Sequence, residues 1–130
     1  MTARVVDASA VVALLFDELP RDAVASRLRD ATLYSPELLG FEVANACLKK
    51  IRAYPEERET LLLAFSIFFE LDIELAPVNL AGVIALASDM KLSVYDASYL
   101  WLAETLGAEL VTLDEKMAKA SAKTRAATTR

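Results

Sequence analysis

The sequence predicts an α/β fold in which a mainly parallel sheet is covered by helices on both faces. Short segments rich in Val and Leu alternate along the chain with longer segments of helical character, a pattern typical of βαβ units. Strands with this composition are usually buried on both faces. In open sheets of this kind, ligands bind at the carboxyl ends of the strands.

Four strands are predicted, and helices fill the intervals between them. Ser9 is expected to cap the first helix, Pro20 and Pro36 to open the second and third, and Gly107 to end a later one. The strands are expected at 4–7, 32–35, 73–78 and 109–114. The helices are expected at 9–17, 21–29, 37–52, 79–89 and 93–106, with another after Pro55 and a last one after the fourth strand.

The length of 130 residues and a hydrophobic content of 55% predict one ordered domain over 1–130. The basic, Ala- and Thr-rich tail at about 122–130 is expected to fray. Asp7 interrupts the apolar N-terminal run, and Asp17 and Glu18 follow it. We therefore interpret this run as a core strand and helix rather than a signal peptide, and expect a cytoplasmic protein.

The composition excludes several kinds of chemistry. The chain has no histidine, which excludes Ser-His-Asp triads and imidazole-bound zinc. Its one cysteine, Cys47, excludes disulfides within the chain and is expected to be a buried structural thiol. The net charge of -5 argues against binding nucleic acid through bulk positive charge, although a local basic patch remains compatible with it.

Four carboxylates are candidates for a shared site. Asp7 and Asp114 end the first and last predicted strands, Asp96 opens the helix before the last strand, and Glu42 lies within the long helix. Each acid has a simpler interpretation as a helix cap, a first-turn acid or a solvated charge. Capping does not explain why Asp7 is embedded among apolar neighbours, because an unpaired buried carboxylate is costly.

If the four acids converge on one edge of the sheet, they repel each other unless a cation lies among them. Oxygen ligands without His or Cys favour Mg²⁺ or Mn²⁺. Such an ion can activate water and stabilise displacement at phosphorus. The sequence therefore predicts a magnesium site, with convergence inferred from the βα layout.

Four segments in this order resemble the PIN-domain family, and more closely the VapC-type toxins of toxin–antitoxin pairs. They are ValAspAlaSerAlaVal (6–11), GluLeuLeuGlyPheGluValAlaAsn (37–45), TyrAspAlaSerTyrLeuTrpLeuAla (95–103) and LeuValThrLeuAspGluLysMet (110–117). The resemblance covers nearly the whole chain. It implies a three-layer α/β/α PIN-like fold and a Mg²⁺-dependent endoribonuclease that cleaves RNA, with Mn²⁺ as a substitute.

The resemblance also assigns roles to individual residues. Asp7, Glu42, Asp96 and Asp114 match the family's acidic metal site, and none of the acids is missing. Ser9 and Thr112 match supporting hydroxyls, and Asn45 matches a polar neighbour of the glutamate. The family further implies a homodimer and inhibition by a cognate antitoxin protein.

Two surface features extend this hypothesis. Lys49, Lys50 and Arg52 follow Glu42 on the same predicted helix and are candidate RNA phosphate contacts, with an ordinary solvated face as the equal alternative. The aromatic residues Phe65, Phe68 and Phe69 favour a homodimer that involves the helices after Tyr34; the alternative is that these rings pack within the chain.

Three other classes compete with a nuclease. The first is a catalytically inert PIN-fold binding module, against which the complete set of acids argues. A phosphoacceptor receiver domain needs adjacent acids after the first strand, but here Asp7 is followed by Ala8. It also needs a lysine at the end of the last strand, and LeuValThrLeuAsp (110–114) contains none. A haloacid-type phosphatase needs a second Asp at the position of Ser9.

Overall fold

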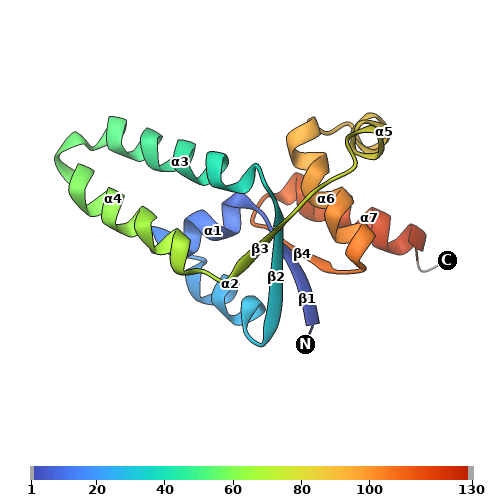
Figure 1. Cartoon of the computed structure of the whole chain (residues 1–130), viewed down its shortest axis with the longest axis horizontal. Coiled ribbons are helices and arrows are strands. Elements are labelled where there is room, and N and C mark those ends of the chain that lie inside the picture. The colour runs from blue at the N-terminus through green and yellow to red at the C-terminus, as the bar shows by residue number, and fades with distance from the viewer. Residues whose placement is uncertain (1, 129–130) are drawn as a thin grey trace.

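A four-stranded parallel sheet forms the centre of the computed structural model, which describes residues 2–128 (Figure 1). The strand order is β3-β2-β1-β4, and every neighbouring pair is parallel. The strands are β1 (Thr2–Val6), β2 (Ala31–Pro36), β3 (Ile73–Ala76) and β4 (Glu109–Val111). The predicted α/β fold with a parallel sheet is therefore confirmed.

Helices cover both faces of the sheet and make it the middle of three layers. The helices α5, α6 and α7 lie on one side, where α6 packs on β1, β2 and β4, and the helices α1 to α4 lie on the other (Figure 1). Their bounds are α1 (Ala8–Leu15), α2 (Arg21–Leu28), α3 (Leu39–Ala53), α4 (Arg58–Ser66), α5 (Leu80–Met90), α6 (Val94–Leu106) and α7 (Glu115–Thr128), with 3-10 turns η1 (Pro55–Glu57) and η2 (Ile67–Glu70).

The core lies where the central strand β1 meets the two helical layers. Val5 and Val6 point to opposite faces of the sheet and are both fully buried. They join Val11 of α1 and Leu100 of α6 in one hydrophobic cluster. Burial on both faces at this end of β1 explains why two valines follow each other there.

The helices α3 and α4 pack against each other and project together away from the sheet (Figure 1). The side chain of Cys47 is buried between them, as expected for a structural thiol, and its Sγ lies 3.7 Å from the carbonyl oxygen of Leu61. Burial raises the pKa of this thiol. Both observations favour packing over reactivity.

Several predicted boundaries were wrong. Asp7, and not Ser9, caps α1, because its carboxylate accepts a hydrogen bond from the backbone N–H of Ala10. Pro36 ends β2 instead of opening the next helix, since α3 begins at Leu39. Glu42 consequently lies in the first turn of α3 and not deep within the helix.

The region after β4 also differs from expectation. The strand ends at Val111, so Asp114 lies three residues beyond it. The last helix, α7, continues to Thr128, and residues 129–130 lie outside the described part of the chain; fraying from about residue 122 stays a prediction. Within the described residues, no helix has the length and apolar character that crossing a membrane requires.

The strand order places a switch point beside β1. The chain moves outward from β1 to β2 and β3, then returns to add β4 on the opposite side of β1. Connections leaving the carboxyl ends of β1 and β4 therefore diverge to the two helical layers, and this is the place where open α/β sheets usually bind ligands. Asp7 is the residue that follows β1 at this point.

Candidate active site

Asp7 is a buried carboxylate held by neutral hydrogen-bond donors. Its side chain is 6% exposed. Its Oδ1 accepts hydrogen bonds from Ser9 Oγ at 2.6 Å and Ala10 N at 3.2 Å, and its Oδ2 accepts one from the Thr112 hydroxyl. Burial raises the pKa of Asp7, although these hydrogen bonds act in the opposite direction. No Lys or Arg of the described residues forms an ion pair with it.

The two predicted supporting hydroxyls brace this carboxylate. Each hydroxyl has one proton, and both Ser9 and Thr112 donate it to Asp7. Their oxygens then accept from backbone N–H groups, Ser9 from Leu113 at 2.9 Å and Thr112 from Asp114 at 3.0 Å. The start of α1 and the β4–α7 connection are thus tied together through one buried acid.

Glu42 and Asp96 face this centre from the helices α3 and α6. Glu42 is half-buried, and its Oε1 accepts a hydrogen bond of 2.5 Å from the hydroxyl of Tyr99, whose side chain is 2% exposed. Burial raises the pKa of Glu42, and the nearby carboxylates of Asp96 and Asp7 raise it further. Asp96 stands in the first turn of α6, where its N–H donates to the capping Ser93 Oγ at 3.0 Å.

Asp114 completes the set and also caps a helix. Its Oδ1 accepts a hydrogen bond of 3.0 Å from the backbone N–H of Met117 in the first turn of α7. Its charge contributes to raising the pKa of Asp7. The capping interpretation is therefore correct for both Asp7 and Asp114, and it coexists with their mutual repulsion.

The charge of Asp114 acts on Asp7, and the charges of Asp7 and Asp96 act on Glu42, but the four side chains do not gather around one point. Among the residues 2–128, no three acidic or cysteine side chains stand close enough to bind one ion together. Hydrogen bonds fix the positions of two of these side chains, Glu42 through Tyr99 and Asp114 through the N–H of Met117 in α7. The donor chemistry nevertheless suits a hard cation such as Mg²⁺, because every candidate ligand is a carboxylate oxygen and no cationic side chain compensates Asp7.

The remaining predicted residues lie along α3, at increasing distance from Glu42. Asn45 is exposed one turn later. Lys49 and Arg52 are exposed toward the outer end of the helix, about 10 and 15 Å along its axis from Glu42. Lys50 is already engaged, since its Nζ forms an ion pair with Glu18 at 2.9 Å and lies 5.2 Å from the ring centre of Phe16.

Sequence reasoning missed Tyr99. Its position three residues after Asp96 was the available signal, since residues separated by three share a helix face. Burial and the hydrogen bond to Glu42 raise the pKa of Tyr99, which keeps the phenol protonated and able to donate. Tyr99 therefore orients one carboxylate of the site.

Comparisons with known proteins agree with this architecture. The model of the PIN domain family matches residues 4–123. Ribonuclease VapC3 of Pyrobaculum aerophilum is 34% identical over 120 residues, which cover 88% of this chain and 92% of that protein. Ribonuclease VapC12 of Mycobacterium tuberculosis is 32% identical over 116 residues, which cover 88% of this chain and 89% of that protein.

Two solved structures share the fold. PAE2754 from Pyrobaculum aerophilum superposes with a TM-score of 0.74 and 26% identity, covering 92% of this chain and 85% of that one. The Mycobacterium tuberculosis toxin VapC20, described as cleaving the sarcin–ricin loop, gives a TM-score of 0.63 at 15% identity over 90% of this chain and 94% of that one. From the family match and the relatives above 30% identity, the chain belongs to the PIN-domain family, among its VapC-type members.

Proposed function

We propose that this protein is a Mg²⁺-dependent endoribonuclease that hydrolyses RNA phosphodiester bonds. The observation that carries the proposal is Asp7, a buried carboxylate that interacts with the charges of Asp114 and Glu42 and has no cationic partner among the described residues. Relatives named as ribonucleases support the choice of reaction and substrate class. A cation is the ligand that such a cluster of carboxylates favours most.

In this proposal Asp7, Glu42, Asp96 and Asp114 hold the ion, and Mn²⁺ can replace Mg²⁺. When bound, the ion supplies a water of lowered pKa and neutralises charge on the scissile phosphate. Ser9 and Thr112 fix the orientation of Asp7, while Tyr99 fixes that of Glu42. Asn45 lies one turn beyond Glu42, where it is available as a polar contact for substrate.

The test is RNA cleavage with controlled divalent ions. Cleavage should require Mg²⁺ or Mn²⁺ and stop with EDTA, and Mg²⁺ should raise the melting temperature of the protein because it relieves carboxylate repulsion. Full cleavage in EDTA would be incompatible with the proposal.

A catalytically inert binding module is the second candidate. The observation that favours it is that no three acidic side chains of the described residues are gathered for one ion. The two candidates differ in a single assay: an inert module binds RNA or protein without Mg²⁺-dependent cleavage at any ion concentration.

The partners follow from the same family membership. We propose that the protein is the toxin of a VapBC-type pair, acts in the cytoplasm and is inhibited by a cognate antitoxin protein. Support comes from the projecting α3–α4 pair, which leaves apolar side chains uncovered in the single chain. The exposed apolar residues of this pair and the adjoining η2 turn include Leu48, Leu62, Leu63, Ile67 and Phe69.

A homodimer is the second assembly that we propose. Phe65 and Phe68 are partly buried against the core, whereas Phe69 is 75% exposed and makes edge-to-face contacts with both, at 5.6 and 5.5 Å between ring centres. The alternative of packing within the chain therefore holds for two of the three rings. Light scattering at micromolar concentration should give twice the mass of 14.2 kDa, and a stable monomer would contradict the proposal.

A further inference from the structure

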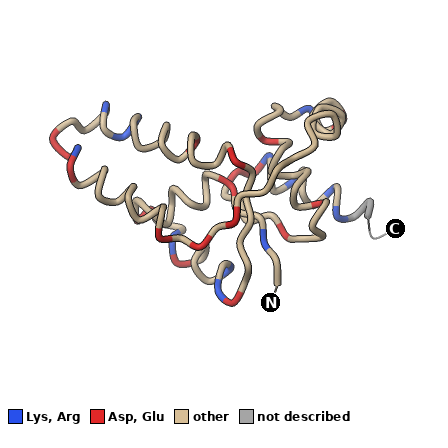
Figure 2. The backbone as a smooth tube through the Cα atoms, viewed as in Figure 1, with Lys and Arg blue, Asp and Glu red and all other residues tan. Residues whose placement is uncertain are grey.

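An RNA strand needs positive charge near the acidic centre, and several cations of this chain are engaged in ion pairs elsewhere. Ion pairs occupy five of the Lys and Arg residues that the structure describes: Arg4, Arg27 and Arg125 with Glu109, Arg21 with Asp17 and Asp22, and Lys50 with Glu18. The uncompensated cations of α3 lie toward its outer end, away from the sheet (Figure 2). The position of the other uncompensated cations therefore decides where phosphates can bind.

Three of these cations form a stripe along one helix. Lys116, Lys119 and Lys123, here called the lysine stripe, lie at positions i, i+3 and i+7 of α7 and are all exposed. None of them forms an ion pair with an acid of the described residues. The stripe is about 10 Å long, which exceeds the rise of about 3.4 Å per phosphate along one nucleic-acid strand.

The lysine stripe lines a pocket formed by segments that lie close in sequence to two of the acids, Asp96 and Asp114. The pocket has a volume of about 210 Å³ and an apolar floor formed by Met90, Leu92 and Ala120. One wall is α7, which begins immediately after Asp114. The other wall ends at Leu92, next to the capping Ser93 of the helix that carries Asp96. Each wall is therefore close in sequence to a carboxylate of the site, Asp114 for one wall and Asp96 for the other.

We propose that the lysine stripe binds the phosphates of the RNA strand next to the cleaved bond. This inference rests on the proposed function and adds the path of the substrate to it. Lysines act as point charges that bind phosphate without fixed geometry, which suits a strand read through its backbone. The apolar floor gives the sugar or base face a surface on which to pack.

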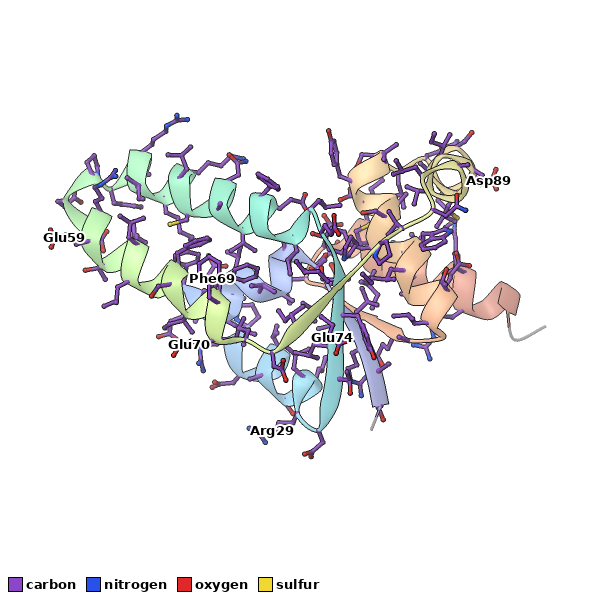
Figure 3. The ribbon with its side chains drawn as sticks, viewed as in Figure 1. Arg29, Glu59, Phe69, Glu70, Glu74 and Asp89 are labelled. Carbon is purple, nitrogen blue, oxygen red and sulfur yellow. The ribbon has the colours of Figure 1, made fainter. Side chains whose placement is uncertain are left out.

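The test compares two triple variants in the Asp7→Asn background, so that RNA stays intact in the presence of Mg²⁺. The first changes Lys116, Lys119 and Lys123 to Gln. The matched control changes Arg21, Arg29 and Arg58 to Gln, which alters the net charge equally on α2, at its carboxyl end and on α4; Figure 3 shows Arg29 away from α7. Binding of a short single-stranded RNA of mixed sequence is measured by fluorescence anisotropy as a function of salt.

The stripe variant should bind the RNA about tenfold more weakly, and its slope of log affinity against log salt should fall by about 2, as expected for three lost contacts to a single strand. The control should change neither quantity appreciably. With Asp7 restored, the stripe variant should show a raised KM for RNA with nearly unchanged kcat, and the same rise in melting temperature with Mg²⁺ as the unmodified protein.

Three results would overturn this proposal. They are an unchanged RNA affinity and salt slope in a folded stripe variant, equal losses in both triple variants, and weakened binding of poly-L-glutamate with unchanged RNA binding, which would assign the stripe to an acidic protein segment. Failure of the proposed function is a separate result, because it appears as absent Mg²⁺-dependent cleavage while the RNA affinity still depends on the stripe.

Discussion

Two carboxylates lie at opposite ends of the paired strands β1 and β4, Glu109 at the amino end and Asp7 just after the carboxyl end. Their charged surroundings differ. At the amino end, Glu109 pairs in register with Arg4, accepts hydrogen bonds from Arg4 at 2.9 Å and from Arg27, and has Arg125 within 3.9 Å. At the carboxyl end, Asp7 is nearly buried and receives only neutral donors.

The difference appears in their proton affinities. The hydrogen bond from Arg27 is the main cause that lowers the pKa of Glu109, whereas burial raises the pKa of Asp7. The protein therefore compensates one charge itself and leaves the other uncompensated. Since an uncompensated buried charge costs stability, its presence favours a functional interpretation, whereas the Glu109 cluster is explained by structure alone.

The largest predicted effect comes from removing the uncompensated charge. Asp7→Asn should leave the protein folded and equally or more stable without metal, because Asn caps a helix as well as Asp does and the repulsion with the other acids falls. Mg²⁺-dependent RNA cleavage should fall at least 100-fold, since even groups behind a metal ligand contribute about 10- to 100-fold. Circular dichroism, thermal melting and cleavage measured on one preparation give all three quantities.

The comparison predicts a further difference in the same experiment. Mg²⁺ should raise the melting temperature of the unmodified protein and change that of Asp7→Asn little. A folded Asp7→Asn protein with near-normal cleavage would mean that Asp7 acts only as the cap of α1.

An intermediate effect is expected at Tyr99. The change Tyr99→Phe keeps the buried ring and removes the hydroxyl that holds Glu42. The Mg²⁺ concentration for half-maximal cleavage should rise about tenfold, and the melting-temperature gain with Mg²⁺ should shrink, because an orienting contact behind a ligand is lost. The free energy of unfolding should fall by about 1 kcal/mol.

Tyr34→Phe is the matched control for Tyr99. Tyr34 is half-buried in β2, and its hydroxyl forms no hydrogen bond with a described residue. This control should leave the Mg²⁺ requirement unchanged. If both variants shift the requirement equally, Tyr99 is a packing residue without a specific link to Glu42.

The sequence predicted the fold well where patterns are local. The four strands follow from composition, and Gly107 ends α6 as predicted, in a left-handed conformation with φ 61°. The error at Ser9 arose where two residues compete for one role. Asp7 displaced Ser9 as the cap because its oxygen reaches the Ala10 N–H, and a sequence does not decide that competition.

The sequence could place two of the candidate acids near each other, but it could not give their contacts. That Asp7 and Asp114 follow adjacent parallel strands suffices to bring them to one edge of the sheet. The link from Glu42 to Tyr99 spans 57 positions between two helices of different layers, so it depends on packing that no spacing rule describes. The arginines around Glu109 were missed for the same reason.

The smallest effect is expected for Glu109→Gln, at the end of the sheet where arginines compensate the carboxylate charge. At neutral pH this change removes the acceptor charge for Arg4 and Arg27, and the free energy of unfolding should fall by about 1 kcal/mol or less because the group is partly exposed. RNA cleavage at saturating Mg²⁺ should not change, since Glu109 lies at the opposite end of β4 from Thr112.

The pH dependence identifies the cause of this small effect. Because the pKa of Glu109 is lowered on folding, the unfolded chain holds more protons near that pKa, so the stabilisation is present above the ordinary glutamate pKa and is lost as pH falls through the lowered value. The stability difference between the unmodified protein and Glu109→Gln, measured by urea unfolding, should therefore shrink on acidification below about pH 4.5. Glu104→Gln, at an exposed position of α6 without an ion pair among the described residues, is the control and should show no such change. A difference for Glu109→Gln that persists unchanged into acid would mean that packing of the side chain, and not its charge, stabilises this end of the sheet.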